Sequence, residues 1–203
     1  MSVHHVKNKP YIIGLTGGIA SGKSTASAYF KSKGIEVIDS DLIVKDLWKE
    51  NEEMIQKAES LFDFKINTIQ DKKKVSQLIF TDKKLRTKLN DIVHPYVFHQ
   101  IEQMIKTFHD QEMIVIDMPL LFEVGYEKKC DITCLVYVDL KTQVERLAKR
   151  DDITEEKALT KIKAQMDLEE KKVKADIILD NQMDLNFLYF QIDQFLRGIK
   201  HAK

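Results

Sequence analysis

A short glycine-rich stretch at residues 17–24 has the residue types and the spacing needed to hold phosphate groups. Its sequence is Gly-Gly-Ile-Ala-Ser-Gly-Lys-Ser, which fits the pattern G-x-x-x-x-G-K-[ST] between an apolar run and a helical pattern. Glycines let consecutive backbone N–H groups face an anion, and the N-terminus of the following helix adds its positive dipole end. We expect Lys23 to contact the β- and γ-phosphates and the Ser24 hydroxyl to ligate metal, so the stretch predicts a site for ATP with Mg²⁺. The expected nucleotide-binding residues of this stretch are Gly18, Ile19, Ala20, Ser21, Gly22, Lys23, Ser24 and Thr25.

Two carboxylates, Asp39 and Asp41, follow the second apolar run in the order Val-Ile-Asp-Ser-Asp. Ligands of open α/β sheets bind beyond the carboxyl ends of the strands. A carboxylate in that place can accept the proton of a hydroxyl group that attacks a phosphate. We therefore favour Asp41 as a catalytic base, and the alternative is that Asp41 caps the helix that follows.

A further acidic residue, Asp117, ends the apolar run at residues 113–117. In sheets that carry a phosphate-binding loop, an acidic residue in this position holds Mg²⁺ through water. Aspartate is also a common turn residue after a strand, which is the alternative interpretation. We expect Ser24 and Asp117 to form the metal site.

Two arginines, Arg146 and Arg150, are four residues apart in a helical pattern and should share one helix face. Guanidinium groups there are suited to stacking on adenine or to neutralising a phosphoryl group during transfer. We expect Arg150 to act in catalysis and Arg146 to bind the nucleotide. The alternative is a surface pair that the neighbouring acidic residues satisfy.

Short β-rich runs alternate with helical patterns along the chain, which predicts a parallel sheet covered by helices. The expected strands are residues 11–16, 35–39, 112–118, 132–139 and 176–179, with helices at 23–33 and 184–197. About 70 residues between the second and third strands have a helical pattern, which is long for a crossover and suits a substrate-binding insertion. Within it, His94 and Pro95 are expected to interrupt a helix, Pro95 at a helix start and His94 in the turn before it. A lone histidine is more often structural than a ligand.

These elements divide the chain into an expected nucleotide-binding core and two helical additions. The core comprises residues 1–45 and 111–203, the helical insertion residues 46–110, and a lid residues 150–175 within the core segment. The lid segment is rich in Lys and Glu with few apolar residues, so it should pack loosely. A mobile lid and a solvated pair of surface helices both fit this composition.

The composition of the 203 residues excludes several classes of protein. Lys plus Arg and Asp plus Glu both number 32, so the net charge is zero and general binding to nucleic acid is not expected. No apolar run approaches the ~18 residues of a membrane span, and the polar residues 1–10 do not resemble a signal peptide. Two cysteines, Cys130 and Cys134, are too few for a disulfide framework or a zinc site, so we expect reduced thiols and a cytoplasmic protein.

Taken in order, the motifs resemble those of the dephospho-coenzyme A kinase family. The resemblance covers residues 12–181 and rests on Gly-Leu-Thr-Gly-Gly-Ile at 14–19, Ile-Asp-Ser-Asp at 38–41 and Leu-Asn-Asp-Ile-Val-His-Pro at 89–95. It continues with Pro-Leu-Leu-Phe-Glu at 119–123, the arginine-containing residues 143–154, and Asp-Asn at 180–181. The chain departs from the family pattern at Lys72, where arginine is usual, and at Met118, where a small aliphatic residue is usual.

The resemblance implies a three-layer P-loop NTPase fold with a five-stranded parallel sheet, a helical substrate-binding insertion and a helical lid. It implies a small-molecule substrate, dephospho-coenzyme A, whose ribose 3′-hydroxyl is phosphorylated by ATP. It also implies that Asp41 is the base and that His94 lies in the acceptor site. We expect no nucleic acid or membrane partner. We expect the protein to be a monomer or a weak homo-oligomer.

Two other functions compete with this interpretation. Another P-loop kinase, for nucleotides, shikimate or gluconate, would share the loop and the lid but not the His-Pro and Pro-Leu-Leu-Phe-Glu segments. A GTP-dependent switch would use Asn-Lys-x-Asp late in the chain, but the Asn-Lys pair of this chain is at residues 8–9.

Overall fold

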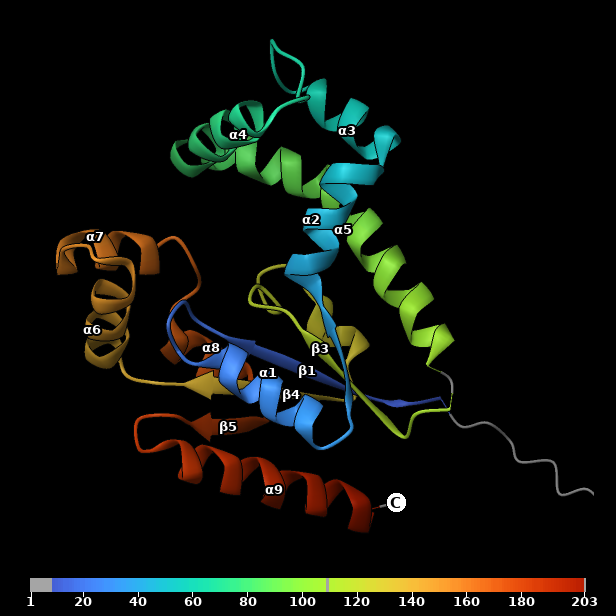
Figure 1. The fold of residues 1–203 in the computed structure, drawn as a ribbon, viewed down its shortest axis with the longest axis vertical. Helices are drawn as coiled ribbons and strands as arrows, with labels where there is room; N and C mark the ends of the chain where they lie inside the picture. Colours follow the sequence, from blue (N-terminus) through green and yellow to red (C-terminus); the bar gives the residue numbers. More distant parts are fainter. Residues whose placement is uncertain (1–8, 109, 203) are drawn as a thin grey trace, which may run out of the picture. The chain divides into compact units, whose positions relative to one another are not determined.

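A five-stranded parallel sheet with the strand order β2-β3-β1-β4-β5 lies at the centre of the part of the chain that contains the glycine-rich stretch (Figure 1). Its strands are β1 (Tyr11–Gly17), β2 (Glu36–Asp39), β3 (Met113–Asp117), β4 (Ile132–Tyr137) and β5 (Ile177–Asp180). The computed structural model describes residues 9–108 and 110–202. Most of the polar N-terminal stretch, for which no signal peptide is expected, lies outside the described residues.

Helices cover both faces of this sheet, because its central strand β1 is apolar on both sides. One face buries Ile13 and Leu15 against α1 (Lys23–Ser32) and α9 (Leu185–Ala202). The other face packs Leu135 and Tyr137 against Leu168 of α8 (Leu168–Lys174). The three layers confirm the fold class predicted from the sequence.

The chain divides into two compact units, residues 1–38 with 108–203 and residues 39–107. The second unit consists of α2 (Ser40–Glu50), α3 (Glu52–Glu59), α4 (Ile69–Thr81) and α5 (Lys83–Thr107). It begins before residue 46, because α2 packs on α3 and α5 and so belongs to the helical unit. Its core includes four α5 residues that recur every fourth position and face inward, Leu89, Val93, Val97 and Ile101.

The interruption expected at His94 and Pro95 is wrong, because α5 is a continuous helix with Pro95 in its interior. Proline removes the N–H that would bond to the carbonyl four residues earlier. Asp91, which carries that carbonyl, and Pro95 are both exposed, so water can satisfy the lost bond. His94 therefore lies within α5, one residue before Pro95.

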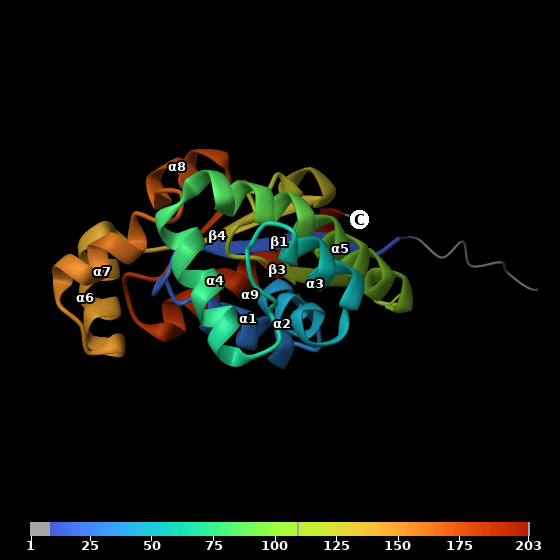
Figure 2. The same ribbon diagram turned by 90° about the horizontal axis from the view of Figure 1, so that it is seen from above.

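The segment after β4 is better packed than its composition predicts. It forms α6 (Leu140–Asp151) and α7 (Glu155–Ile162), and Ala158 and Ile162 of α7 are buried against Leu147 of α6. Ile19 and Ala20 of the glycine-rich loop pack on the same cluster. The contact between α7 and α6 and the route of the chain into α8 are visible in Figure 2.

Within the described residues 9–108 and 110–202, no helix has both the length and the apolar character of a membrane span. Cys130 and Cys134 are free thiols, as expected. Burial raises the pKa of Cys130 to about 12, which makes this thiol unreactive at neutral pH.

Candidate active site

The glycine-rich loop joins the end of β1 to the start of α1, and its conformation requires glycine. Gly22 has a φ angle of 92°, and a Cβ atom there would lie 2.1 Å from the Asn181 side-chain nitrogen. A Cβ atom on Gly17 would lie 2.5 Å from Ser21 Oγ, so the loop closes tightly on itself. Ala20 also has a positive φ of 61°. This backbone has the tight, glycine-dependent form expected of an anion-binding turn.

The N-terminus of α1 has no side-chain cap, and its first turn contains no acidic residue. Other α-helices of the described chain start with capping side chains, namely Asp39, Asn51, Thr68, Asp139, Thr154 and Asp167. The first-turn N–H groups of α1 and its dipole are therefore suited to an external anion. The Ser24 residue in this turn is exposed, as a metal ligand must be.

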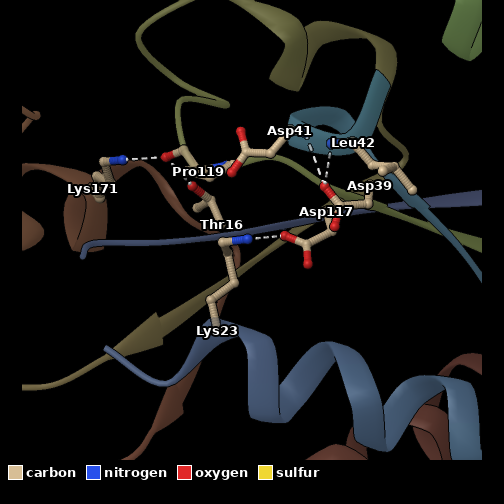
Figure 3. Close-up of polar contacts among 8 residues, drawn as sticks. All are labelled: Thr16, Lys23, Asp39, Asp41, Leu42, Asp117, Pro119 and Lys171. Carbon is tan, nitrogen blue, oxygen red and sulfur yellow. Dashed lines mark hydrogen bonds and ion pairs between the residues drawn. The ribbon is translucent and has the colours of Figure 1, made fainter. Parts of the chain in front are cut away.

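Lys23 of α1 and Asp117 of β3 form an ion pair in this structure (Figure 3). Asp117 reaches this position because it lies at the carboxyl end of β3, paired in register with Leu15 of β1. The two side chains are 16% and 5% exposed. The structure thus brings together the residue expected to hold phosphates and the residue expected to hold Mg²⁺.

Ser24 and Asp117 offer ligands that fit Mg²⁺ bound together with phosphate. They are too few for a metal held by protein side chains alone. A carboxylate and a hydroxyl are hard oxygen ligands of the kind that Mg²⁺ uses while it keeps water and phosphate oxygens. Among the residues that the structure describes, no group of three or more His, Cys, Asp and Glu side chains could hold a metal.

Three amide side chains from distant segments fasten the loop, and the sequence analysis missed their role. Gln143 of α6 donates to the Ile19 carbonyl at 2.7 Å, and the Ile19 N–H donates to Gln165 at 3.0 Å. Asn181, just after β5, donates to the Ser21 carbonyl at 2.8 Å. Gln143 and Asn181 lie in segments of family resemblance, but nothing in their residue types predicts these contacts.

The two arginines of α6 lie in different surroundings. Arg146 is partly buried and donates to the Asn181 carbonyl at 2.9 Å, so it is tied to the residue that holds the loop. Arg150 is exposed and donates to Asp151 at 2.9 Å, and Lys161 of α7 donates to the other oxygen of the same carboxylate. The structure therefore connects Arg146 to the loop and Arg150 to the α6–α7 junction.

In the helical unit, Asp39 and not Asp41 caps α2, as its bonds to the Asp41 and Leu42 N–H groups show (Figure 3). Asp41 is an exposed residue of the first turn. His94 of α5 stacks on Phe98 with ring centroids 5.8 Å apart. Burial lowers the pKa of His94, which favours a neutral ring at neutral pH.

Lys171 of α8 is a fully buried cation for which the sequence predicted no role. Its Nζ lies 2.9 Å from Glu123 Oε1 and donates to the Pro119 carbonyl at 2.6 Å. Thr16, just before the glycine-rich loop, donates to the same carbonyl at 3.0 Å (Figure 3). Glu123 also accepts the Met166 N–H. The turn after β3 is thus bonded both to β1 and to the root of the expected lid.

Comparison with known proteins shows which family the chain resembles. Residues 11–186 match a family model described as dephospho-CoA kinase. The dephospho-CoA kinase of Fusobacterium nucleatum is 40% identical over 191 residues, which cover 93% of this chain and 98% of that protein. A solved structure from Thermus thermophilus matches with a TM-score of 0.80 at 30% identity, covering 94% of this chain and 98% of that one. The dephospho-CoA kinase of Campylobacter jejuni matches with a TM-score of 0.68 at 25% identity and the same coverage.

Proposed function

Because the chain belongs to the dephospho-CoA kinase family, we propose that it transfers the γ-phosphate of ATP to the ribose 3′-hydroxyl of dephospho-coenzyme A. The observation that carries this proposal is the uncapped N-terminus of α1 beside the paired Lys23 and Asp117. A helix start without its own cap binds an anion, and the lysine and the carboxylate supply the contacts that a metal-bound triphosphate needs.

In the proposed reaction the acceptor oxygen forms a bond to the γ-phosphorus while the bond between that phosphorus and the bridging oxygen breaks. ADP leaves, and the hydroxyl proton passes to the Asp41 carboxylate and then to solvent. Lys23 holds the β- and γ-phosphates as a point charge throughout. Ser24 and Asp117 would hold Mg²⁺, which would supply charge neutralisation on the phosphate oxygens. Coenzyme A and ADP are the products.

The arginines are assigned to separate tasks in this proposal. Arg146 is anchored by Asn181, so it serves as a fixed contact for the nucleotide. Arg150 is held by an exposed ion pair with Asp151, which contributes little free energy and is easily exchanged. Transfer of Arg150 from this carboxylate to a phosphate would add positive charge when ATP is bound. His94, on α5, is assigned to the acceptor.

An acceptor panel tests this function. Purified protein with Mg²⁺ and ATP is given dephospho-coenzyme A, AMP, shikimate or gluconate, and ADP release is measured together with the mass of the product. We expect turnover with dephospho-coenzyme A and none at a comparable rate with the others. The Lys23→Ala protein, purified in the same way, controls for contaminating kinases. Turnover with another acceptor, and none with dephospho-coenzyme A, would overturn the proposal.

A nucleotide panel tests the donor separately. GTP in place of ATP should give much slower transfer, because the chain has no Asn-Lys-x-Asp segment late in its sequence. Tight GTP binding without transfer to any acceptor would instead indicate a nucleotide-dependent switch.

A further inference from the structure

The peptide group between Ile19 and Ala20, in the middle of the glycine-rich loop, is held from outside by one buried side chain. Gln143 of α6 is 3% exposed, and its amide donates to the Ile19 carbonyl at 2.7 Å. Gly18 makes room for this contact, because a Cβ atom on it would lie 2.5 Å from the Gln143 amide nitrogen. The Ile19 carbonyl therefore points toward α6.

The direction of this carbonyl also sets the direction of the Ala20 N–H. In a planar trans peptide the C=O and N–H bonds point in opposite directions, and the described chain has no cis peptide bond. The Ala20 N–H therefore points away from α6. No acceptor for it is found in the described part of the chain. An open backbone donor in this loop is suited to a phosphate oxygen.

This orientation of the peptide strains Ala20. Its φ angle of 61° lies in the left-handed region, which residues with a Cβ atom rarely adopt. Turning the peptide over, by about half a turn, would bring φ of Ala20 into the negative range that alanine prefers. The Ile19 carbonyl oxygen would then take the place of the N–H and repel a phosphate. The relaxed arrangement of the loop is thus the one less able to bind an anion.

We propose that Gln143 is a positioning residue that holds this peptide with the Ala20 N–H toward the phosphates of ATP, an inference that rests on the proposed function. The hydrogen bond from Gln143 to the Ile19 carbonyl exists only in the strained arrangement, so it offsets the strain at Ala20. The loop is thereby shaped for phosphate before the nucleotide arrives.

Other contacts fix Ile19 itself and leave the following peptide as the part that can turn. The Ile19 N–H donates to Gln165 at 3.0 Å, so the peptide before Ile19 is held separately. The Ile19 side chain packs on the buried cluster of α6 and α7, which consists of Leu147, Ala158 and Ile162. The two glutamines therefore have different tasks, and the orientation of the Ile19–Ala20 peptide depends on Gln143.

Gln143→Met tests the proposal, because methionine keeps the length of the side chain and removes the donor. Binding of Mg²⁺-ATP and of Mg²⁺-ADP is measured by calorimetry without acceptor. The Kd for each should rise roughly 3- to 10-fold, since a smaller fraction of the protein has the competent loop. The kcat at saturating ATP should change less, because bound ATP selects that loop. A Kd equal to that of wild type would overturn the proposal.

Thr133→Val controls for a general loss of stability. It removes a buried hydroxyl that bonds to Asp176 near the start of β4. It should lower the melting temperature and leave both Kd values unchanged. A rise in Kd as large as that in Gln143→Met would show that any loss of stability weakens binding, and would overturn the proposal.

Replacement of Ala20 by glycine separates positioning from a merely structural role. Glycine adopts positive φ without strain, so the loop of the Ala20→Gly protein needs less support. Gln143→Met should therefore raise the Kd for ATP by a smaller factor in the Ala20→Gly protein than in wild type. Ala26→Gly, in the helical part of α1, is the control and should leave that factor unchanged. An equal factor in the Ala20→Gly and wild-type proteins would overturn the proposal.

Ala20→Val decides the matter if Gln143→Met does not fold. A β-branched residue disfavours positive φ more than alanine does, so the Kd for ATP should rise although Gln143 is present. An unchanged Kd would overturn the proposal. The failure of the proposed function is distinguishable: wild-type protein that binds neither ATP nor ADP would overturn both proposals. Wild-type protein that phosphorylates dephospho-coenzyme A, with no effect of these substitutions on Kd, would overturn the role of Gln143 alone.

Discussion

The Asp39 carboxylate accepts the backbone N–H of Asp41 at 2.9 Å. It accepts the N–H of Leu42 at 3.1 Å as well, so Asp39 is the N-cap of α2 and Asp41 is the second residue of its first turn. Helix capping, the alternative role considered for Asp41, is therefore filled by its neighbour. The role of Asp41 as the base stays a prediction that a substitution can test.

Asp41→Asn should lower kcat by about 10²–10⁴-fold, the usual contribution of a positioned general base. Asparagine keeps the size of the side chain and one hydrogen-bonding oxygen but cannot accept the proton. The KM for ATP and the melting temperature should change little, because the glycine-rich loop and the cap of α2 are untouched. Steady-state kinetics and thermal unfolding of the variant check both expectations.

Asp39 provides the matched controls. Asp39→Asn should behave as wild type, because asparagine caps helices as well as aspartate does. Asp39→Ala should lower stability by about 0.5–2 kcal/mol through loss of the cap. A kcat for Asp41→Asn within a few-fold of wild type, or a larger loss in Asp39→Asn, would assign the base elsewhere.

Lys23→Ala should abolish turnover and also lower stability. The substitution removes the charge for the phosphates and leaves the nearly buried Asp117 carboxylate without its cation. Loss of one partner of a buried pair costs about 3 kcal/mol or more. The double variant Lys23→Ala with Asp117→Asn should recover most of the melting temperature but none of the activity. Recovery of activity in the double variant would contradict the assigned role of Lys23.

Arg150→Ala should lower kcat more than it weakens ATP binding. We expect closure around bound phosphates to draw the Arg150 guanidinium inward and to exclude water, so that its contribution is made during transfer. Lys161→Ala is the control, because Lys161 pairs with the same Asp151 carboxylate. If both substitutions lowered kcat equally, the effect would come from loss of the surface ion pairs with Asp151, and the predicted role of Arg150 in transfer would be wrong.

The buried pair of Lys171 and Glu123 makes a prediction about stability. Glu123→Gln should cost about 3–5 kcal/mol, because it leaves a fully buried ammonium group without its carboxylate. Lys171→Met should cost less, because Glu123 is 20% exposed and keeps the Met166 N–H. Urea unfolding of both single variants and of the double variant measures these losses in stability. A larger loss in Lys171→Met than in Glu123→Gln would contradict the prediction.

The pH dependence of Glu123→Gln follows from the same burial. Desolvation lowers the pKa of Lys171 below its ordinary 10.5, and Glu123 opposes that shift. Without Glu123 the folded-state pKa falls further, so between that pKa and 10.5 the unfolded chain binds more protons than the folded one. The free energy of unfolding of Glu123→Gln should therefore rise, relative to wild type, as pH increases toward 10.5. The account would be contradicted if the free energy of unfolding of Glu123→Gln, relative to that of wild type, fell as pH increased toward 10.5.

The sheet and the glycine-rich loop were predictable because their signals are local. Apolar runs bounded by glycine or aspartate predicted each strand to within two residues, and the motif that contains Lys23 predicted the turn between β1 and α1. The distinction between Asp39 and Asp41 as the cap was not predictable, because it depends on a shift of one or two residues in the helix start. The continuity of α5 through Pro95 was missed, because it depends on whether water can reach the Asp91 carbonyl, which loses its helical hydrogen bond to Pro95. The exposure of Asp91 is set by tertiary packing and cannot be read from the local sequence.

The side chains that fasten the loop could not be predicted, since their contacts join distant segments. Gln143 donates to the Ile19 carbonyl and Gln165 accepts the Ile19 N–H, although they lie 124 and 146 residues further along the chain. Lysine is rarely buried, and the burial of Lys171 becomes intelligible only when Glu123 and the Pro119 carbonyl are seen beside it. Such pairings depend on the folded arrangement and leave no periodic pattern in the sequence.

Transfer to the ribose 3′-hydroxyl is tested most directly by locating the new phosphate in the product. Wild-type protein, Mg²⁺, ATP and dephospho-coenzyme A are incubated, and the purified product is analysed by ³¹P NMR and by digestion with a 3′-specific nucleotidase. The predicted product is coenzyme A, with a monophosphate that couples to the ribose 3′ proton and is released by the nucleotidase. A phosphate on another oxygen of the acceptor, or release of ADP with free phosphate only, would contradict the proposed function.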